Sequence, residues 1–173
     1  MTNDFYRQLG MGVSSLTFGV ALSIFIYAAA TNVATTIQAW ILFGASFFLM
    51  LRLWWRYNEL FVQQLPSNTY WHFLLDFAVS FFGILAVLSV SDMQKWAVLG
   101  IMTMLSSAAR CALSWKGAGN AMPKLIKTLC GAAGMLAVFA AAYYISPFVD
   151  SVMLAGVVFL IVLVFTIYSS LKP

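Results

Sequence analysis

The chain has 173 residues, of which 63% are hydrophobic and only 8% are charged, whereas soluble domains carry about 25% charged residues. Nine lysines and arginines and five acidic residues cannot cover the surface of a soluble protein of this size, so the composition excludes that class and predicts an integral membrane protein. The net charge of +4 does not indicate nucleic-acid binding, because the basic residues lie beside apolar segments and not along a basic helix face.

Six apolar runs are long enough to cross a bilayer, which takes about 20 residues in a helix. Polar or turn-forming residues separate them, and backbone groups in lipid must be satisfied within the segment, so every run is expected to be helical. The sequence therefore predicts an all-α, polytopic integral membrane protein: a six-helix transmembrane bundle that forms a single domain over residues 1–173. The spans are expected at residues 11–30, 39–62, 71–91, 96–115, 126–146 and 151–171.

The basic residues predict the orientation of this bundle. With six spans, both termini and the second and fourth connections share one side of the membrane. Of the nine lysines and arginines, all but Lys95 fall on that side, while Asp92 and Asp150 fall on the other. Lysine and arginine are enriched in cytoplasmic connections, which predicts a protein of the cytoplasmic (inner) membrane with both termini cytoplasmic. The residues on the predicted cytoplasmic side are Arg7, Arg52, Arg56, Arg110, Lys116, Lys124, Lys127 and Lys172.

Two arginines, Arg52 and Arg56, lie inside the second apolar run, near its predicted cytoplasmic end. Their neighbours Trp54, Trp55 and Tyr57 are residue types that prefer the headgroup region of a bilayer. Arginine side chains at this depth can extend toward the headgroups. The first interpretation of this segment is therefore an interfacial anchor.

The second interpretation is a structural ion pair within the membrane. Asp76 lies just inside the third run, at the depth of Arg56 in a hairpin that turns near Pro66. A carboxylate in lipid is costly unless it is paired. The sequence therefore predicts that Asp76 pairs with Arg56, with Arg52 as the competing partner. His72 lies one turn before Asp76 and could join this cluster, but a lone histidine at this depth is more often an interfacial residue, which is the preferred interpretation.

Similar short segments recur at the predicted outer ends of the even-numbered spans. Gly44, Gly100 and Gly156 are evenly spaced, and the first two follow the related sequences "QAWILFG" and "QKWAVLG". This spacing is consistent with three repeated helical hairpins. Eleven glycines make a chance coincidence easy, so the spacing alone does not establish a repeat.

Small residues predict which helices pack most tightly. Helices in lipid associate where small side chains let two backbones approach. The fifth span contains "CGAAGMLAVFAAA" and the fourth contains several hydroxyl residues, so Gly134, Ala137 and Ser106 are predicted to lie buried between helices, in an interior formed by the first, fourth and fifth spans. The sixth span is almost uniformly bulky and apolar. Its residues Leu160, Val162 and Phe165 are expected to face lipid or another subunit.

Residues that would carry out chemistry are scarce. The chain has one histidine, and its two cysteines, Cys111 and Cys130, lack the spacing of a metal or redox pair. No phosphate-binding loop, nucleophile elbow or zinc-protease sequence is present. The sequence predicts no enzymatic activity, no catalytic, cofactor-binding or metal-ligating residues and no cofactor. The cysteines are expected to be free thiols.

The predicted depth of the charges bears on transport. Ion-coupled carriers keep ionisable groups near the membrane midplane, whereas every charge here maps to the cytoplasmic third or to an outer connection. This pattern argues against an ion-coupled carrier. The sequence favours a small transport or channel subunit that acts as an oligomer, and the alternative is a non-catalytic accessory or assembly subunit of a larger membrane complex. The expected partners are the lipid bilayer, further copies of the chain or other membrane subunits, and no nucleic acid.

Overall fold

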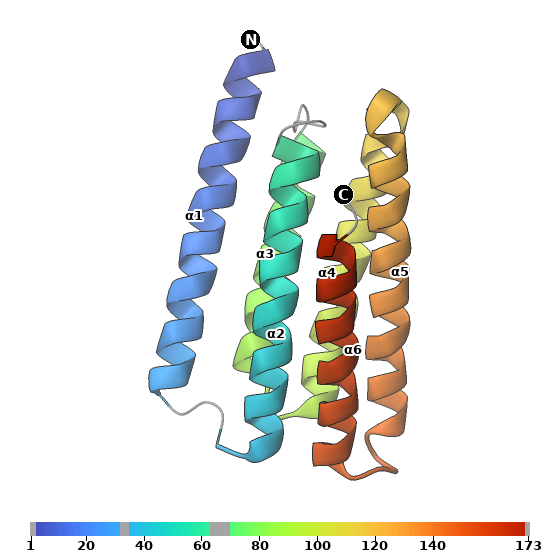
Figure 1. Cartoon of the computed structure of the whole chain (residues 1–173). Helices are drawn as coiled ribbons and strands as arrows, with labels where there is room; N and C mark the ends of the chain where they lie inside the picture. The colour runs from blue at the N-terminus through green and yellow to red at the C-terminus, as the bar shows by residue number, and fades with distance from the viewer. Residues whose placement is uncertain (1–2, 32–34, 63–69, 172–173) are drawn as a thin grey trace.

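The computed structural model describes residues 3–31, 35–62 and 70–171, and these ranges contain helices and no strand. Six long helices run alternately up and down (Figure 1). A π-helix, η1 (Tyr57–Val62), continues the second of them, and two 3-10 turns, η2 (Trp115–Gly117) and η3 (Gly119–Ala121), join the fourth to the fifth. The long helices are α1 (Asn3–Ala30), α2 (Ile37–Arg56), α3 (Tyr70–Leu88), α4 (Met93–Ser114), α5 (Met122–Ile145) and α6 (Ser151–Leu171).

The length and composition of these helices fit a membrane. Five helical segments, from α2 to α6, are long and apolar enough to cross one, and α1 contributes a shorter apolar stretch, Phe18–Ala30. The predicted all-α membrane bundle is confirmed, and its boundaries fall within a few residues of the expected spans except at the start of α1. The protein is therefore an integral membrane protein in which α1 supplies the sixth, less apolar helix.

Charge separates the two ends of the bundle. Helices α1, α3 and α5 begin, and α2 and α4 end, at the end that is uppermost in Figure 1. We name this end the basic end, and the other the opposite end, where Asp92, Lys95 and Asp150 lie. The side chain of Arg7 and the whole of Lys172 lie outside the described residues. The described cations of the basic end are Arg52, Arg56, Arg110, Lys116, Lys124 and Lys127.

The three helices that begin at the opposite end are capped by side chains. The hydroxyl of Thr36 accepts a hydrogen bond from the backbone N–H of Ala39 at the start of α2. The carboxylates of Asp92 and Asp150 accept two backbone N–H groups each at the starts of α4 and α6. These bonds satisfy donors that the first helical turn leaves without a partner. The polar connections of the sequence therefore fix where the helices start.

The core lies where α2, α4, α5 and α6 meet. Trp96 of α4 is 1% exposed and packs against the Phe139 ring of α5, with ring centroids 4.9 Å apart. Its indole N–H donates to the hydroxyl of Ser46 in α2 over 2.8 Å. This bond satisfies a polar group that would otherwise be costly in an apolar interior. Large buried side chains therefore define the interior.

The predicted small-residue interior needs correction. Within the single chain, Gly134 and Ala137 lie on the exposed face of α5, and a Cβ atom at Gly134 would meet nothing within 4 Å. Ser106 is only half-buried, and its hydroxyl donates to the carbonyl of Met102 in its own helix. Helix α5 has small residues around its whole circumference, so the spacing of Gly134 and Ala137 does not indicate which face points inward. The close approach occurs at Gly100, where an added Cβ would overlap the Phe139 ring.

Helix α6 also differs from its predicted orientation in part. Leu160 is 59% exposed, as the sequence predicts, but Val162 is fully buried. Phe165 packs over Gly131 of α5, where a Cβ would lie 2.9 Å from its ring. Because α6 is apolar all round, its sequence does not reveal the inward stripe. That stripe has helical spacing and consists of Leu154, Ala155, Val158 and Val162.

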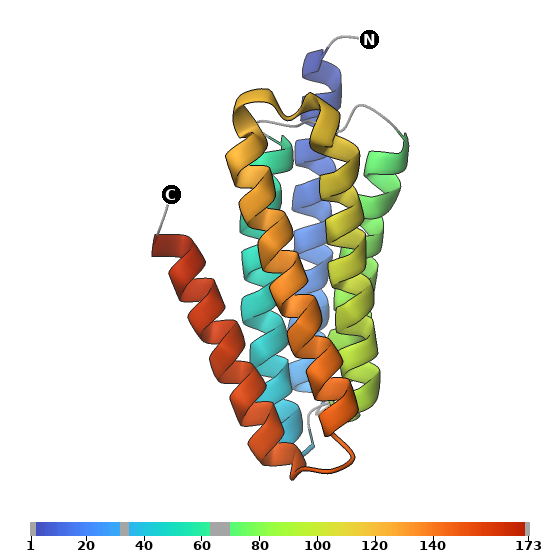
Figure 2. The same ribbon diagram turned by 90° about the vertical axis from the view of Figure 1, so that its right-hand side faces the viewer.

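The three consecutive hairpins pack differently. Helices α3 and α4 pack together along their length, whereas α1 touches α2 little and α6 packs mainly on α2. Figure 2 shows α6 inclined away from α5 toward its C-terminal end. The evenly spaced glycines also have different surroundings. A Cβ at Gly44 would lie against the Phe159 ring, whereas a Cβ at Gly156 would meet nothing within 4 Å.

Candidate functional site

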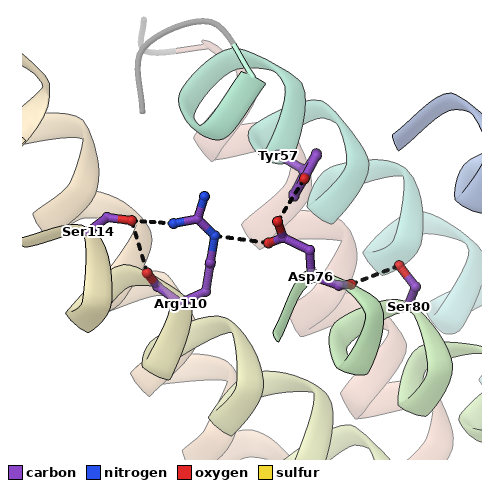
Figure 3. A network of polar contacts seen from close by, with 5 residues as sticks. All are labelled: Tyr57, Asp76, Ser80, Arg110 and Ser114. Atoms are coloured by element: carbon purple, nitrogen blue, oxygen red, sulfur yellow. Dashed lines mark hydrogen bonds and ion pairs between the residues drawn. The ribbon is translucent and has the colours of Figure 1, made fainter. Parts of the chain in front are cut away.

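A buried ion pair joins α3 and α4 near the basic end. The Nε of Arg110 lies 3.0 Å from Oδ1 of Asp76, and the two side chains are 2% and 6% exposed. The second carboxylate oxygen, Oδ2, accepts a hydrogen bond of 2.8 Å from the hydroxyl of Tyr57 in η1 (Figure 3). One carboxylate therefore connects α3 with α4 and with the end of the second span.

Residues of α4 hold the arginine in place. The Nη1 of Arg110 donates to the hydroxyl of Ser114, one turn along the helix, and this hydroxyl donates to the carbonyl of Arg110 (Figure 3). His72 of α3 is buried, lies near Arg110 and hydrogen-bonds the backbone of Leu113. The Ser114 hydroxyl thus helps to orient the guanidinium that pairs with the carboxylate of Asp76.

A second cluster surrounds Glu59 in the π-helix η1. Its Oε2 lies 2.8 Å from Nη1 of Arg56, and its Oε1 lies 3.0 Å from Nζ of Lys124 in α5. The Glu59 side chain is about a quarter exposed, so solvent screens these pairs more than the Asp76 pair. Together the two clusters, which we name the ionic network, connect α2, η1, α3, α4 and α5 near the basic end.

The predicted partner of Asp76 is corrected by this geometry. The sequence predicts Arg56, with Arg52 competing, but Arg110 takes that position and Arg56 pairs with Glu59. The prediction matches residues by their depth in a hairpin, and such matching does not distinguish a partner on α2 from one on α4, which also forms a hairpin with α3. Helix α3 packs far more closely on α4 than on α2. Arg52 lies buried one turn from Arg56 in α2.

Sequence reasoning places Arg110 and Lys124 at the correct end but assigns neither to a cluster. The sequence contains part of the missing signal, because Arg110 and Ser114 lie four residues apart, one helical turn, near the C-terminal end of the fourth span. A polar pair with this spacing, in the helix that follows Asp76, makes α4 a candidate source of the partner. The contact of Glu59 with Lys124 spans 65 residues of sequence, and no local pattern predicts it.

The arrangement is suited to holding helices together. Both carboxylates accept bonds on each of their two oxygens from cationic or hydroxyl partners. A charge that is paired and hydrogen-bonded in this way is tolerated in a low-dielectric interior, whereas removing one partner is strongly destabilising. Among the residues that the structure describes, no three His, Cys, Asp or Glu side chains group as metal ligands, and Cys111 and Cys130 form no disulfide.

Apolar side chains fill the interior between the ionic network and the opposite end. Met104, Met135 and Phe139 are each no more than 2% exposed, and with Trp96 they close the space between α2, α4 and α5. A cavity of about 10 Å³ lies beside them, next to Ser46 and other residues of α2, α3 and α4. This volume is about the smallest that can hold one water molecule.

Comparisons with known proteins identify no matching family, no similar curated protein and no similar solved structure.

Proposed function

We propose that the protein is a non-catalytic accessory or assembly subunit of a membrane complex. The observation that supports this most is the interior of the bundle. Five of its described charges pair with one another near one end, as Arg56–Glu59–Lys124 and Asp76–Arg110. Packed apolar side chains such as Met104 and Phe139 fill the space beyond them. In the part of the chain that the structure describes, this packing leaves little interior space, and the proposed role is carried by the faces that the bundle presents to other helices.

The outward faces of α5 and α6 are suited to that role. On α5, Gly134 and Ala137 are exposed and leave room for another backbone to approach. On α6, Leu160 and Val164 are both more than half exposed and offer an apolar surface. In lipid, the hydrophobic effect does not favour contact between helices over contact with the acyl chains. Helices therefore associate through close packing of such faces.

A transport or channel subunit is the second candidate. Because apolar side chains pack the described interior beyond the ionic network, a path for ions or solutes would run between chains, along a symmetry axis of an oligomer. The two candidates therefore differ in the particle that they predict: repeated copies of this chain around a conduit, or this chain bound to different membrane proteins.

We also propose that the basic end faces the cytoplasm of a cell with a cytoplasmic (inner) membrane. The described residues of this end include six cations, and those of the opposite end include only Lys95. Cytoplasmic connections of membrane proteins are enriched in lysine and arginine. In this orientation both termini lie on the cytoplasmic side.

The composition of the native particle tests the proposed function. The tagged full chain would be extracted from its own membrane in polymer-bounded lipid discs, and the intact particles weighed by native mass spectrometry. An accessory subunit gives this chain together with other integral membrane chains in a fixed ratio. Particles that contain only copies of this chain, and that pass ions when reconstituted at the same stoichiometry, would overturn the proposal in favour of a channel.

A further inference from the structure

The turn between α4 and α5 concentrates positive charge at the basic end. It carries Lys116 in η2 and, just beyond it, Lys124 and Lys127 in the first two turns of α5. Trp115, which begins the turn, is 44% exposed. We name residues 115–127 the lysine turn, and Figures 1 and 2 place it at the tip of the bundle.

The described carboxylates of this end are outnumbered by its cations, and Lys124 of the turn binds one of them. Asp76 is bound to Arg110, and Glu59 divides its two oxygens between Arg56 and Lys124. The described side chains of the basic end contribute six cations and two carboxylates, and six minus two leaves a net charge of +4. Lys116 is exposed, so part of this charge is accessible from outside the bundle.

The surroundings of the lysine turn are those of a membrane surface. Exposed indole rings, which prefer the level of lipid headgroups, lie at this end on three different elements: Trp55 of α2, Trp71 of α3 and Trp115 of η2. Lysines at the same level meet headgroup phosphates, and clusters of basic residues beside a span attract anionic lipids. Charge complementarity thus identifies the chemistry of the partner.

We propose that the lysine turn is a docking surface for the headgroups of anionic phospholipids, with Lys116 and Lys127 as the principal contacts and Trp115 at the level of the headgroups. Lys124 adds positive charge but has a structural role as well, because its amine holds Glu59. This inference concerns the lipid partner and goes beyond the proposed function, on which it does not depend.

Lipid retention by the purified full chain tests the proposal. The chain, in neutral detergent, would be mixed with phosphatidylglycerol or phosphatidylcholine of equal chain length, and bound lipid counted by native mass spectrometry. The test variant is Lys116→Gln/Lys127→Gln, and the matched single variants are Lys116→Gln and Lys95→Gln, the latter at the opposite end. Phosphatidylglycerol binding should weaken roughly 5-fold for each lysine removed from the turn and remain unchanged in Lys95→Gln. Raising the salt concentration should weaken binding to the wild-type chain in the same direction.

Three results would overturn the proposal. They are equal retention of phosphatidylglycerol by the double variant and the wild type, an equal loss in Lys95→Gln, or equal binding of the two lipids. A parallel arm with inorganic phosphate and no lipid distinguishes a site for the free ion: protection against thermal unfolding by phosphate alone, lost in the double variant, would contradict the lipid assignment. Helical circular dichroism and the thermal midpoint in phosphatidylcholine establish that each variant is folded before its lipid binding is compared.

Discussion

The hydroxyl of Tyr57 donates a hydrogen bond of 2.8 Å to Oδ2 of Asp76 and so connects the π-helical end of the second span to α3. This bond satisfies the carboxylate oxygen that Arg110 leaves open. The π-helix widens the last turns of the span, and π-helical turns are often found at functional sites. Here η1 directs Tyr57 toward α3 and Glu59 toward α5.

Replacing Tyr57 with phenylalanine removes this donor and keeps the ring. We expect Tyr57→Phe to lower the free energy of unfolding by about 1.5–3 kcal/mol, the range for a hydrogen bond to a charged group. The matched control is Tyr144→Phe, because the Tyr144 side chain is 71% exposed at the opposite end. Unfolding in mixed micelles, followed by circular dichroism, measures both. An equal, small effect of the two changes would show that the Tyr57 bond contributes little.

Two glycines of neighbouring helices distinguish the structure from the sequence prediction. A Cβ at Gly100 would overlap the Phe139 ring, which would have to shift although it is buried against Trp96. Gly100→Ala should therefore destabilise the bundle by about 1–3 kcal/mol, as overpacking does. Gly134→Ala meets no neighbour and should be neutral or stabilising by up to about 1 kcal/mol, because alanine favours helix. The reverse order of the two effects, measured in the same unfolding assay, would restore Gly134 to the interior.

Hydropathy predicts the helices of this fold well, because the bilayer imposes length and composition on every span. It does not predict the rotation of each helix. Val162 and Leu160 lie two residues apart in an all-apolar helix, and only packing on α2 and α5 places one inside and the other outside. Asp76 is recognisable as a residue that needs a partner, since charge in lipid is costly. Its choice of Arg110 depends on the close packing of α3 on α4, which the sequence does not reveal.

The Asp92 carboxylate that caps α4 should make the stability of the bundle depend on pH. The backbone N–H of Lys95, assisted by the Lys95 side chain and the N–H of Gln94, lowers the pKa of Asp92 below its ordinary value. A lowered pKa means that the stability contributed by the carboxylate is complete above the unfolded-state pKa, about 3.9, and is lost as the pH falls through the folded-state value. Asp92→Ala should destabilise by about 1 kcal/mol at pH 7. The difference from wild type should shrink below about pH 4.

The uncharged cap of α2 is the control for this experiment. Thr36 accepts a hydrogen bond from Ala39 in the same way but does not ionise in this range. The stability difference between wild type and Thr36→Ala should therefore stay constant from pH 7 to acid. A parallel decline in both variants would assign the pH effect to another group.

Labelling of single cysteines in intact cells tests the proposed orientation. In a chain with Cys111 and Cys130 replaced by serine or alanine, a cysteine at Pro147 should react with an impermeant maleimide added from outside. A cysteine at Asn120, in the lysine turn, should react only after the membrane is made permeable. Labelling of Asn120→Cys from outside, with Pro147→Cys protected, would reverse the orientation.

The central claim is that the intramembrane charges are structural and that Arg110 is the principal partner of Asp76. A double-mutant cycle on the free energy of unfolding tests it most directly, with Asp76→Asn and Arg110→Gln singly and together, and a second cycle that pairs Asp76→Asn with Arg56→Gln. We expect Asp76→Asn alone to cost about 3–5 kcal/mol, because it leaves a buried cation without its partner. The coupling energy of Asp76 with Arg110 should be about 2–3 kcal/mol, and that with Arg56 below about 0.5 kcal/mol. Negligible coupling to Arg110, or equal coupling to Arg56, would contradict the claim.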